Sequence, residues 1–275
     1  MRLESSLASV VRGVDFFYSD YPQLPSDSFA DFFVRLHPPA GIRRFARPQV
    51  NFFLDTAQPF KPLPLDQAFP LFEWGLNWCV AQNCHQYLSI HAAVLERNGR
   101  AVILPGFPGA GKSTLAAALA LRGWRLLSDE LTLVDLESGL IVPIPRPISI
   151  KNKAIEIVEN FDDRARIGER VTDTSKGTVA HMRVLTDSVT RAQESAAPCA
   201  VLFPKYQEGA KNSLTDLDKG LVFMQLAELS FNYGVLGRSG FEAMSRLMDA
   251  CACYGLDYNG DLDFAVGVLD DLVAP

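Results

Sequence analysis

One short segment limits the possible folds of this chain more than any other feature. Residues 106–113 read Gly-Phe-Pro-Gly-Ala-Gly-Lys-Ser and match the pattern G-x-x-x-x-G-K-[ST] at every fixed position. A nearly continuous apolar segment (100–106) precedes it, and an Ala- and Leu-rich segment (112–123) follows it. These flanks predict a buried strand, a tight loop and a helix, in that order. The order favours an α/β fold with the loop at one end of a central sheet.

The glycine-rich loop, residues 106–113, has the composition of a phosphate-binding loop. Its glycines allow positive φ angles and leave backbone N–H groups open to an anion at the start of a helix. Lys112 would carry positive charge to the β- and γ-phosphates, and the hydroxyl of Ser113 would bind Mg²⁺. ATP and Mg²⁺ are therefore the expected cofactors, and a glycine turn without a ligand is the alternative. The predicted nucleotide-binding residues of this segment are Gly106, Pro108, Gly109, Ala110, Gly111, Lys112, Ser113 and Thr114.

Two adjacent acids follow the next predicted strand. Asp129 and Glu130 end the segment WRLLSDE (124–130), soon after the glycine-rich loop. A carboxylate at a strand end beside a phosphate loop binds Mg²⁺ or takes a proton from an attacking hydroxyl. An ordinary Walker B acid usually comes much further along the chain. A solvated strand end is the alternative interpretation of this pair.

His91 lies in the predicted strand YLSIHAAVLER (87–97), just before the strand that leads into the loop. Asn98-Gly99 is typical of a two-residue hairpin turn, so the two strands are predicted to pair. That pairing would bring His91 near the glycine-rich loop. A histidine in an apolar strand is, taken alone, more often a core residue with a satisfied hydrogen bond.

Composition excludes several other classes of protein. The chain has 275 residues, of which 48% are hydrophobic and 21% charged, so it is expected to be globular rather than disordered. Its net charge of −6 argues against broad nucleic-acid binding, which needs a basic face. The five cysteines have no zinc-site spacing and are expected to be free thiols. Without a signal peptide or an apolar run of membrane-spanning length, the expected location is the cytoplasm, with no membrane partner.

The chain is predicted to have two unequal parts. Residues 1–65 are rich in aromatics and prolines, and two short aromatic segments (31–36 and 49–54) predict strands. This part is expected to be a small N-terminal β-rich module. Residues 66–275 alternate strand and helix patterns and are expected to form the larger domain. Within it, the polar segment 162–180 is predicted to be a mobile loop.

The segment from Ile90 to Glu130 resembles the catalytic core of HPr kinase/phosphorylase, and is closer still to the bacterial group called HPr-kinase-related kinase A. In those proteins a strand histidine precedes a β-hairpin, a phosphate loop, a helix that ends in Arg-Gly, and two acids; Arg122-Gly123 fits that helix end. The resemblance is close over residues 85–160 and looser elsewhere. It implies an α/β P-loop kinase core of the HPr kinase/PEP carboxykinase type, with a small N-terminal β-rich (α+β) module.

The resemblance also implies roles for single residues. Asp129 falls on the family's catalytic aspartate, which takes the proton from the acceptor serine. His91 falls on the histidine that contacts this aspartate, and both join Lys112 in the predicted catalytic set. Glu130 replaces the second aspartate of the family's pair, which keeps the charge and lengthens the side chain. Ser113, Asp129 and Glu130 are the predicted metal ligands.

Two parts of the family pattern have no clean match, namely its signature loop and its downstream arginine. The N-terminal segment also differs from the regulatory domain of true HPr kinases, so HPr itself is not the expected acceptor. The candidate bases that would neutralise phosphate charge are Arg146, Lys151, Lys176 and Lys205, of which Lys205 is preferred. Arg146 and Lys205 complete the predicted nucleotide-binding set. A solvated surface base is the alternative for each.

An aromatic segment and a second histidine have two interpretations each. Residues 73–78, Glu-Trp-Gly-Leu-Asn-Trp, lie in the predicted helix 65–83 and are expected to pack the N-terminal module onto the larger domain. An acceptor pocket is the alternative use of this segment. His181 follows the predicted polar loop, and its alternative role is a contact with the acceptor.

Together these patterns predict an enzyme, an ATP-dependent kinase that transfers the γ-phosphoryl group to a serine-type hydroxyl of a peptide, a protein or a small molecule. The alternative is a non-catalytic nucleotide-binding protein with a regulatory or assembly role, which Glu130 and the missing signature loop favour. A motor-type ATP hydrolase fits less well, because the acid pair comes early and no arginine finger is recognisable. Related HPr kinases form rings and also run the reaction backwards with phosphate. A homo-oligomer and phosphorolysis therefore stay open, and the sequence decides neither.

Overall fold

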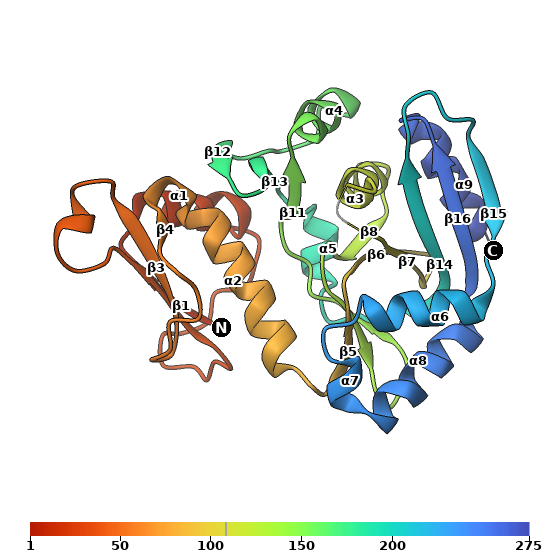
Figure 1. Ribbon diagram of the computed structural model, residues 1–275, viewed down its shortest axis with the longest axis horizontal. Coiled ribbons are helices and arrows are strands. Elements are labelled where there is room, and N and C mark those ends of the chain that lie inside the picture. Colours follow the sequence, from red (N-terminus) through yellow and green to blue (C-terminus); the bar gives the residue numbers. More distant parts are fainter. Residues whose placement is uncertain (108, 275) are drawn as a thin grey trace.

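The strand that leads into the glycine-rich loop lies inside a six-stranded sheet of a mixed α/β protein (Figure 1). The computed structural model describes residues 1–107 and 109–274. The strands of this sheet are β6 (Ala92–Arg97), β7 (Arg100–Pro105), β8 (Arg125–Ser128), β14 (Ala197–Tyr206), β15 (Ser213–Asp216) and β16 (Ala252–Tyr258). Their order is β15-β16-β14-β7-β6-β8, in which β14 runs parallel to β7 and β16 and the other pairs are antiparallel.

The predicted hairpin before the loop is confirmed. Asn98 and Gly99 have φ angles of 56° and 77°, the positive values that a tight two-residue hairpin turn needs. They join β6 to β7 with Arg97 opposite Arg100. All of β7 after its first residue is buried, as predicted for a central strand.

The strand register gathers the predicted site residues at one end of the sheet. The first residues of β6 pair with the last residues of β7 and of β8. His91 immediately precedes β6, while Gly106 and Asp129 immediately follow β7 and β8. The two antiparallel pairings therefore bring these three residues to the same edge.

Helices cover both faces of the six-stranded sheet (Figure 1). The helices of this part are α3 (Lys112–Leu121), α4 (Lys153–Phe161), α5 (Thr186–Thr190), α6 (Lys219–Glu228), α7 (Tyr233–Leu236), α8 (Arg238–Ala250) and α9 (Leu262–Leu272). α3 and α9 share a hydrophobic core with one face, and α6 and α8 share a core with the other. Alternate residues of β6 and β7 enter the two cores, as the two-residue period of a strand requires. No helix in the described ranges has both the length and the apolar character needed to cross a membrane.

Two small sheets flank the site. The first contains β5 (Tyr87–Ile90), β9 (Thr132–Asp135) and β10 (Ile141–Val142), and the second contains β11 (Ile148–Lys151), β12 (Val171–Thr174) and β13 (Gly177–Met182). The prediction of a mobile loop over residues 162–180 is wrong for the part that forms β12 and β13. This hairpin has a polar, exposed end, which hid its strands from a composition argument, whereas its C-terminal residues are buried.

The N-terminal part contains a four-stranded sheet, two α-helices and two short 3₁₀ helices. Its elements are β1 (Arg2–Ser5), α1 (Ala8–Phe17), β2 (Phe33–His37), the short helix η1 (Ile42–Arg44), β3 (Gln49–Leu54), β4 (Leu63–Pro64), the short helix η2 (Leu65–Gln67) and α2 (Ala68–Asn83). The two predicted strands are confirmed as β2 and β3, and the predicted helix as η2 followed by α2. α1 was not predicted. The sheet, α1 and α2 share one hydrophobic core, which includes Phe17, Phe52 and Phe72. The boundary between residues 65 and 66 stays a prediction.

α2 lies between the N-terminal sheet and the rest of the molecule (Figure 1). The hydroxyl of Tyr21 donates to the carbonyl of Pro145 at 2.8 Å, and Asp20 pairs with Arg183 at 2.6 Å. The ring of His181 packs edge-on against the ring of Phe69, with 5.5 Å between centroids. The N-terminal part is therefore held against the strands that carry the site.

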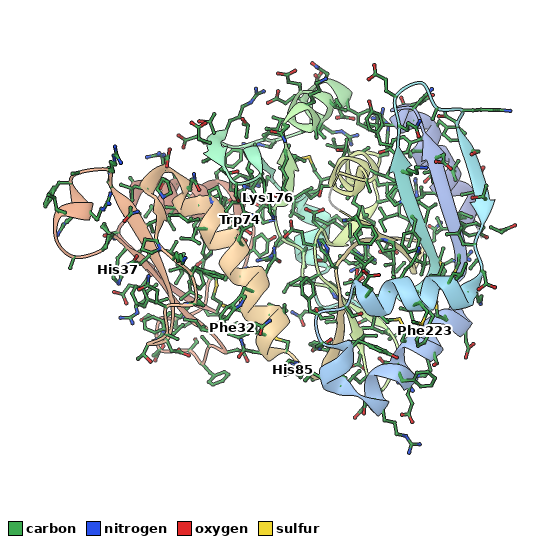
Figure 2. The ribbon with its side chains drawn as sticks, in the orientation of Figure 1. Phe32, His37, Trp74, His85, Lys176 and Phe223 are labelled. Atoms are coloured by element: carbon green, nitrogen blue, oxygen red, sulfur yellow. The ribbon has the colours of Figure 1, made fainter. Side chains whose placement is uncertain are left out.

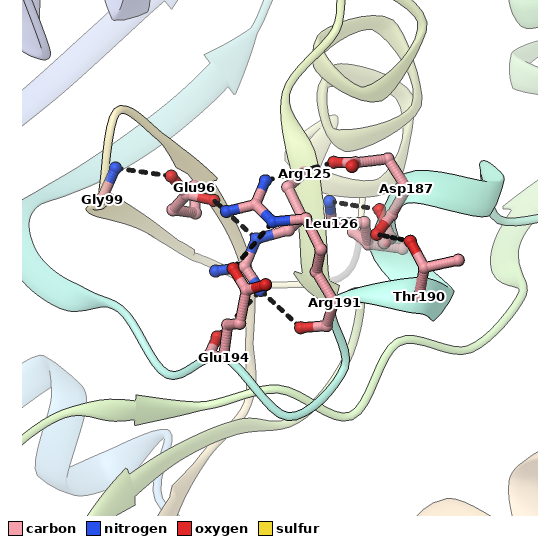
Figure 3. Close-up of polar contacts among 9 residues, drawn as sticks. Glu96, Gly99, Arg125, Leu126, Asp187, Thr190, Arg191 and Glu194 are labelled. Carbon is pink, nitrogen blue, oxygen red and sulfur yellow. Dashed lines mark hydrogen bonds and ion pairs between the residues drawn. The ribbon is translucent and has the colours of Figure 1, made fainter.

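A buried ion pair lies at the end of the sheet away from the glycine-rich loop (Figure 3). Arg125 Nε lies 2.5 Å from Glu96 Oε2, and each side chain is only 3% exposed. Arg125 also donates to the carbonyls of Arg191 and Glu194, and Glu96 accepts from the N–H of Gly99. Because each charge has several partners, the pair meets the condition under which a buried ion pair is tolerated.

Candidate functional site

The glycines of the glycine-rich loop adopt backbone angles that favour glycine. Gly106, Gly109 and Gly111 have φ angles of 145°, 90° and 93°. A Cβ atom on Gly111 would lie 2.4 Å from Tyr258 Oη, closer than non-bonded atoms approach. The loop therefore needs glycine both for its positive φ angles and for its close approach to Tyr258 at the end of β16. Its composition suits a phosphate-binding loop. Pro108, predicted to bind nucleotide, lies outside the described residues.

The first turn of α3 brings the loop against the acid pair. Lys112 Nζ donates to the carbonyl of Gly106, so its amine closes over the loop. Burial lowers the pKa of Lys112, while the charges of Asp129 and Glu130 act in the opposite direction. The hydroxyl of Ser113 donates to Asp129 Oδ2 at 3.3 Å. The predicted Mg²⁺-binding hydroxyl and the predicted base are therefore direct neighbours.

Asp129 is buried, with only 6% of its surface exposed. Besides Ser113, its Oδ2 accepts from the backbone N–H of Ser149 at 2.9 Å. Its Oδ1 has no hydrogen-bond partner among the described residues. Burial and the neighbouring charge of Glu130 raise the pKa of Asp129 to about 6. One oxygen of this carboxylate is held by hydrogen bonds, the other has no partner among the described residues, and its pKa lies below neutral pH. These are the properties of a general base.

Glu130 is held by partners on both sides. Its Oε2 accepts from Asn77 Nδ2 at 2.5 Å, and its Oε1 lies 3.7 Å from Lys151 Nζ. Burial raises the pKa of this carboxyl, but the positive charges of Lys151, Lys176 and Arg146 outweigh burial and lower it below its ordinary value. Glu130 is therefore ionised at neutral pH.

The donor set of the acid pair suits Mg²⁺. It offers two carboxylates, Asp129 and Glu130, and the hydroxyl of Ser113, all oxygen ligands of the kind that Mg²⁺ prefers. The Ser113 hydroxyl and Asp129 Oδ2 lie 3.3 Å apart, so that both would reach one ion, which supports this fit. Among the described residues, no group of three or more His, Cys, Asp or Glu side chains has a metal-site arrangement.

Arg146 connects the acid pair to the N-terminal part. Its guanidinium donates to Asn77 Oδ1 and lies 3.8 Å from Glu73 Oε2. The hydroxyl of Tyr18 in turn donates to Glu73 Oε1 at 2.7 Å. Burial raises the pKa of Glu73, and Arg146 and Tyr18 counteract that effect. A continuous polar chain thus runs from Tyr18 to Glu130.

The other predicted basic residue, Lys205, lies at a different place. Its side chain is 70% exposed and pairs with Asp257 at 3.6 Å. The next residue, Tyr206, donates its backbone N–H to the carbonyl of Ala110 at 3.3 Å, so the end of β14 adjoins the glycine-rich loop. Thr114 is half-buried in the first turn of α3. Among the basic candidates, Lys151 pairs with Glu130 and Arg146 reaches Glu130 through Asn77, whereas Lys205 pairs with Asp257.

His91 is half-buried at the expected edge of the sheet. Its backbone N–H donates to the carbonyl of Leu229 at 2.9 Å, and its ring lies 5.8 Å from the ring of Phe231. Burial and the charge of Lys112 lower the pKa of His91. Among the described residues, no hydrogen bond joins its ring to Asp129. The tuning role that the resemblance implies for His91 stays a prediction.

Several residues of the site were missed or given another role by sequence reasoning. The backbone of Ser149 fixes Asp129, and no local pattern around Ser149 indicates this. Tyr18 directly follows α1, the helix that was not predicted. Glu73 and Asn77 were expected to serve packing, and the only sequence signal for a site role was the density of polar and aromatic side chains in one helix. Searches against known family models and against curated proteins find no match for this chain.

Proposed function

We propose that this protein is an ATP-dependent phosphotransferase that moves the γ-phosphoryl group of ATP to a hydroxyl acceptor. The observation that carries the proposal is the 3.3 Å hydrogen bond between Ser113 of the glycine-rich loop and Asp129. It joins a loop of phosphate-binding composition to a buried carboxylate whose second oxygen has no hydrogen-bond partner among the described residues. Phosphoryl transfer depends chiefly on such positioning and on charge stabilisation.

The residues divide the work as follows. The N–H groups of the loop and the amine of Lys112 would bind the phosphates. Asp129 Oδ1 would take the proton of the acceptor hydroxyl. The acceptor oxygen would then bond to the γ-phosphorus as the bond from that phosphorus to ADP breaks. Ser113, Asp129 and Glu130 would hold Mg²⁺, which when bound neutralises charge on the β- and γ-phosphates. Lys151, 3.7 Å from Glu130, and Arg146, next to Glu130 through Asn77, are further sources of positive charge.

The test is transfer of γ-labelled phosphate from ATP by the wild type and by Asp129→Asn. Asp216→Asn is the matched control, because Asp216 is exposed on β15. The proposal expects ATP binding by both variants and phosphoryl transfer by the control alone. Equal transfer by the two variants would contradict the role of Asp129.

A second function is favoured by one observation. Two charged residues of the site already have protein partners. Glu130 contacts Lys151 and Asn77, and Arg146 contacts Glu73 and Asn77. A site with its charges compensated suits a nucleotide-binding regulatory protein that transfers nothing. ATP binding without ADP formation, with every class of acceptor, would support this alternative.

A further inference from the structure

The turn between β12 and β13 carries a lysine, Lys176, beside the acid pair. Hydrogen bonds fix the backbone of this turn. The N–H of Lys176 donates to Thr174 Oγ1 at 3.1 Å, and Asn152 Nδ2 donates to the carbonyl of Lys176 at 3.3 Å. Asn152 directly follows Lys151, the residue that pairs with Glu130. The hairpin therefore holds Lys176 next to the strand that carries Lys151.

The side chain of Lys176 lies over the ring of Trp74. Its Nζ is 5.3 Å from the ring centroid, the geometry of a cation–π contact, and Figure 2 shows the two side chains together beside α2. Trp74, Asp129 and Glu130 line one pocket. Burial raises the pKa of Glu130, and the charge of Lys176 is among those that lower it. The amine of Lys176 is therefore within electrostatic reach of the acid pair.

The site has more cations than carboxylates. The charged groups whose fields act on Glu130 include four cations and two further carboxylates, namely Lys112, Arg146, Lys151, Lys176, Glu73 and Asp129. With Glu130 itself, this set has four positive and three negative charges. Arg146 and Lys151 each pair with a carboxylate, whereas no carboxylate of the described residues pairs with Lys176. The ligand that would balance this set is an anion.

Lys176 is also open to such a ligand. Its residue is exposed at the tip of the hairpin, so a molecule that arrives from solvent reaches it. Partial burial and the like charge of Lys151 lower the pKa of Lys176, and Glu130 counteracts them only in part. An anion beside such an amine favours its charged form. Binding an anion would therefore relieve the repulsion between the two lysines.

The γ-phosphoryl group of ATP is the anion that the proposed site would bring here. The glycine-rich loop and Lys112 would hold the phosphates, and Asp129 would face the acceptor hydroxyl. The phosphorus that is transferred would therefore lie between the loop and the acid pair. Burial lowers the pKa of His91, and the charges of Lys112 and Lys176 add to this effect. Lys176 thus acts on the same edge of the sheet as Lys112, from the side of the acid pair.

We propose that Lys176 is a further catalytic residue, which donates a hydrogen bond to an oxygen of the γ-phosphoryl group, and that Trp74 is its positioning residue. The inference rests on the proposed phosphotransfer. During transfer the acceptor oxygen bonds to the γ-phosphorus, the bond from that phosphorus to ADP breaks, and the acceptor proton goes to Asp129. Lys176 keeps its own proton and neutralises charge on the oxygens in transfer. Because Trp74 belongs to α2, the N-terminal part would share in this phosphate site.

The first test compares ATP with ADP, because only ATP carries the γ-phosphoryl group. Calorimetry on the full chain with Mg²⁺ measures both dissociation constants for the wild type, Lys176→Met and the matched control Lys61→Met, which is at an exposed position of the N-terminal part. Loss of a charged hydrogen bond predicts a Kd for ATP raised about tenfold or more in Lys176→Met, with the Kd for ADP unchanged. A Kd for ATP equal to that of the control, or an equal loss for ATP and ADP, would overturn the inference.

Conservative variants separate charge and position from a merely structural effect. Lys176→Arg keeps the positive charge and should keep most of the preference for ATP over ADP. Trp74→Leu removes the aromatic face under Lys176 and should raise the Kd for ATP about two- to fivefold, with the Kd for ADP unchanged. Trp74→Phe keeps an aromatic face and should recover part of this loss. Equal losses for ATP and ADP in Trp74→Leu would contradict the positioning role.

The rate of transfer distinguishes a failure of this inference from a failure of the proposed function. γ-Labelled ATP at saturating concentration is offered with three acceptor probes, namely a serine-containing peptide, a denatured protein mixture and glycerol. We expect transfer about 10²-fold slower in Lys176→Met and unchanged in Lys61→Met. Equal rates in these two variants would overturn the catalytic role of Lys176 and leave the proposed function intact. No transfer by the wild type to any probe would contradict the proposed function, and the comparison of ATP with ADP would still decide whether Lys176 binds the γ-phosphoryl group.

Discussion

At the scale of single residues, burial raises the pKa of Asp129 and, by the same effect, lowers the stability of the folded protein at neutral pH. Its Oδ2 is fixed by two donors, whereas its Oδ1 has no partner in the described chain. Removing a carboxylate from water disfavours its charged form, and Glu130 adds like-charge repulsion. The reactivity and the instability of this residue therefore have the same cause.

The first prediction at this scale concerns pH. Because burial and Glu130 raise the pKa of Asp129 to about 6, the carboxyl becomes protonated as the pH falls through 6 and stops accepting protons. In the protein without Mg²⁺, the NMR signal of the Asp129 carboxyl carbon should therefore titrate with a midpoint near pH 6. Circular dichroism at each pH checks that the chain stays folded. A midpoint at or below about pH 4, the range of an ordinary aspartate, would refute the assignment.

The second prediction concerns stability. A carboxyl whose pKa is higher in the folded state than in the unfolded state destabilises the fold above the folded pKa, and this penalty disappears as the pH falls below both values. Asp129→Asn removes the charge and keeps an acceptor for Ser113 and Ser149. It should raise the free energy of unfolding at pH 7 by about 1–3 kcal/mol. Urea denaturation measures this, with Asp216→Asn expected within about 0.5 kcal/mol of the wild type. A lower free energy of unfolding in Asp129→Asn than in the wild type would show that the buried charge does not destabilise the fold.

At the scale of elements, the two ends of the six-stranded sheet differ in how their buried charges are paired. At one end, Asp129 has an oxygen that lacks a partner among residues 1–107 and 109–274. At the other, Glu96 and Arg125 satisfy each other and further backbone groups (Figure 3). The same strands, β6 and β8, carry both ends. The ion pair is placed to hold the register on which the site depends.

The third prediction tests that pair. Arg125→Met removes the cation and leaves Glu96 buried without it, so the free energy of unfolding should fall by about 3–5 kcal/mol. The matched control is Arg238→Met, which breaks an exposed pair with Glu242 and should cost less than about 1 kcal/mol. Both are measured by chemical denaturation at pH 7. Similar losses in the two variants would mean that the buried pair adds nothing specific.

The element scale also shows what sequence reasoning could reach. The hairpin signal at Asn98-Gly99 was enough to predict that β6 pairs with β7 and brings His91 near the glycine-rich loop. This signal is local, whereas the pairing of β6 with β8, which brings Asp129 to the same edge, joins residues about thirty positions apart and was not predicted. β12 and β13 were hidden because their hairpin is polar at its exposed end, and only packing against β11 distinguishes it from a loop.

At the scale of the whole molecule, the N-terminal part contributes to the site through α2. Tyr18, Glu73 and Asn77 reach Arg146 and Glu130 through a continuous polar chain. Each of these contacts joins residues more than fifty positions apart in the sequence, and no periodicity encodes such pairings. For this reason the loop and the acid pair were predictable as a site, whereas the contacts of Tyr18, Glu73 and Asn77 with Arg146 and Glu130 were not.

The account's central claim is that the glycine-rich loop and Asp129 act together in phosphoryl transfer from ATP. The most direct measurement is the rate of γ-labelled phosphate transfer to the best acceptor by the wild type, Asp129→Asn and Asp216→Asn, at equal saturation with ATP. Loss of a general base predicts a rate about 10²–10⁴-fold lower in Asp129→Asn, with Asp216→Asn unchanged. A rate in Asp129→Asn within about threefold of the wild type would contradict the claim.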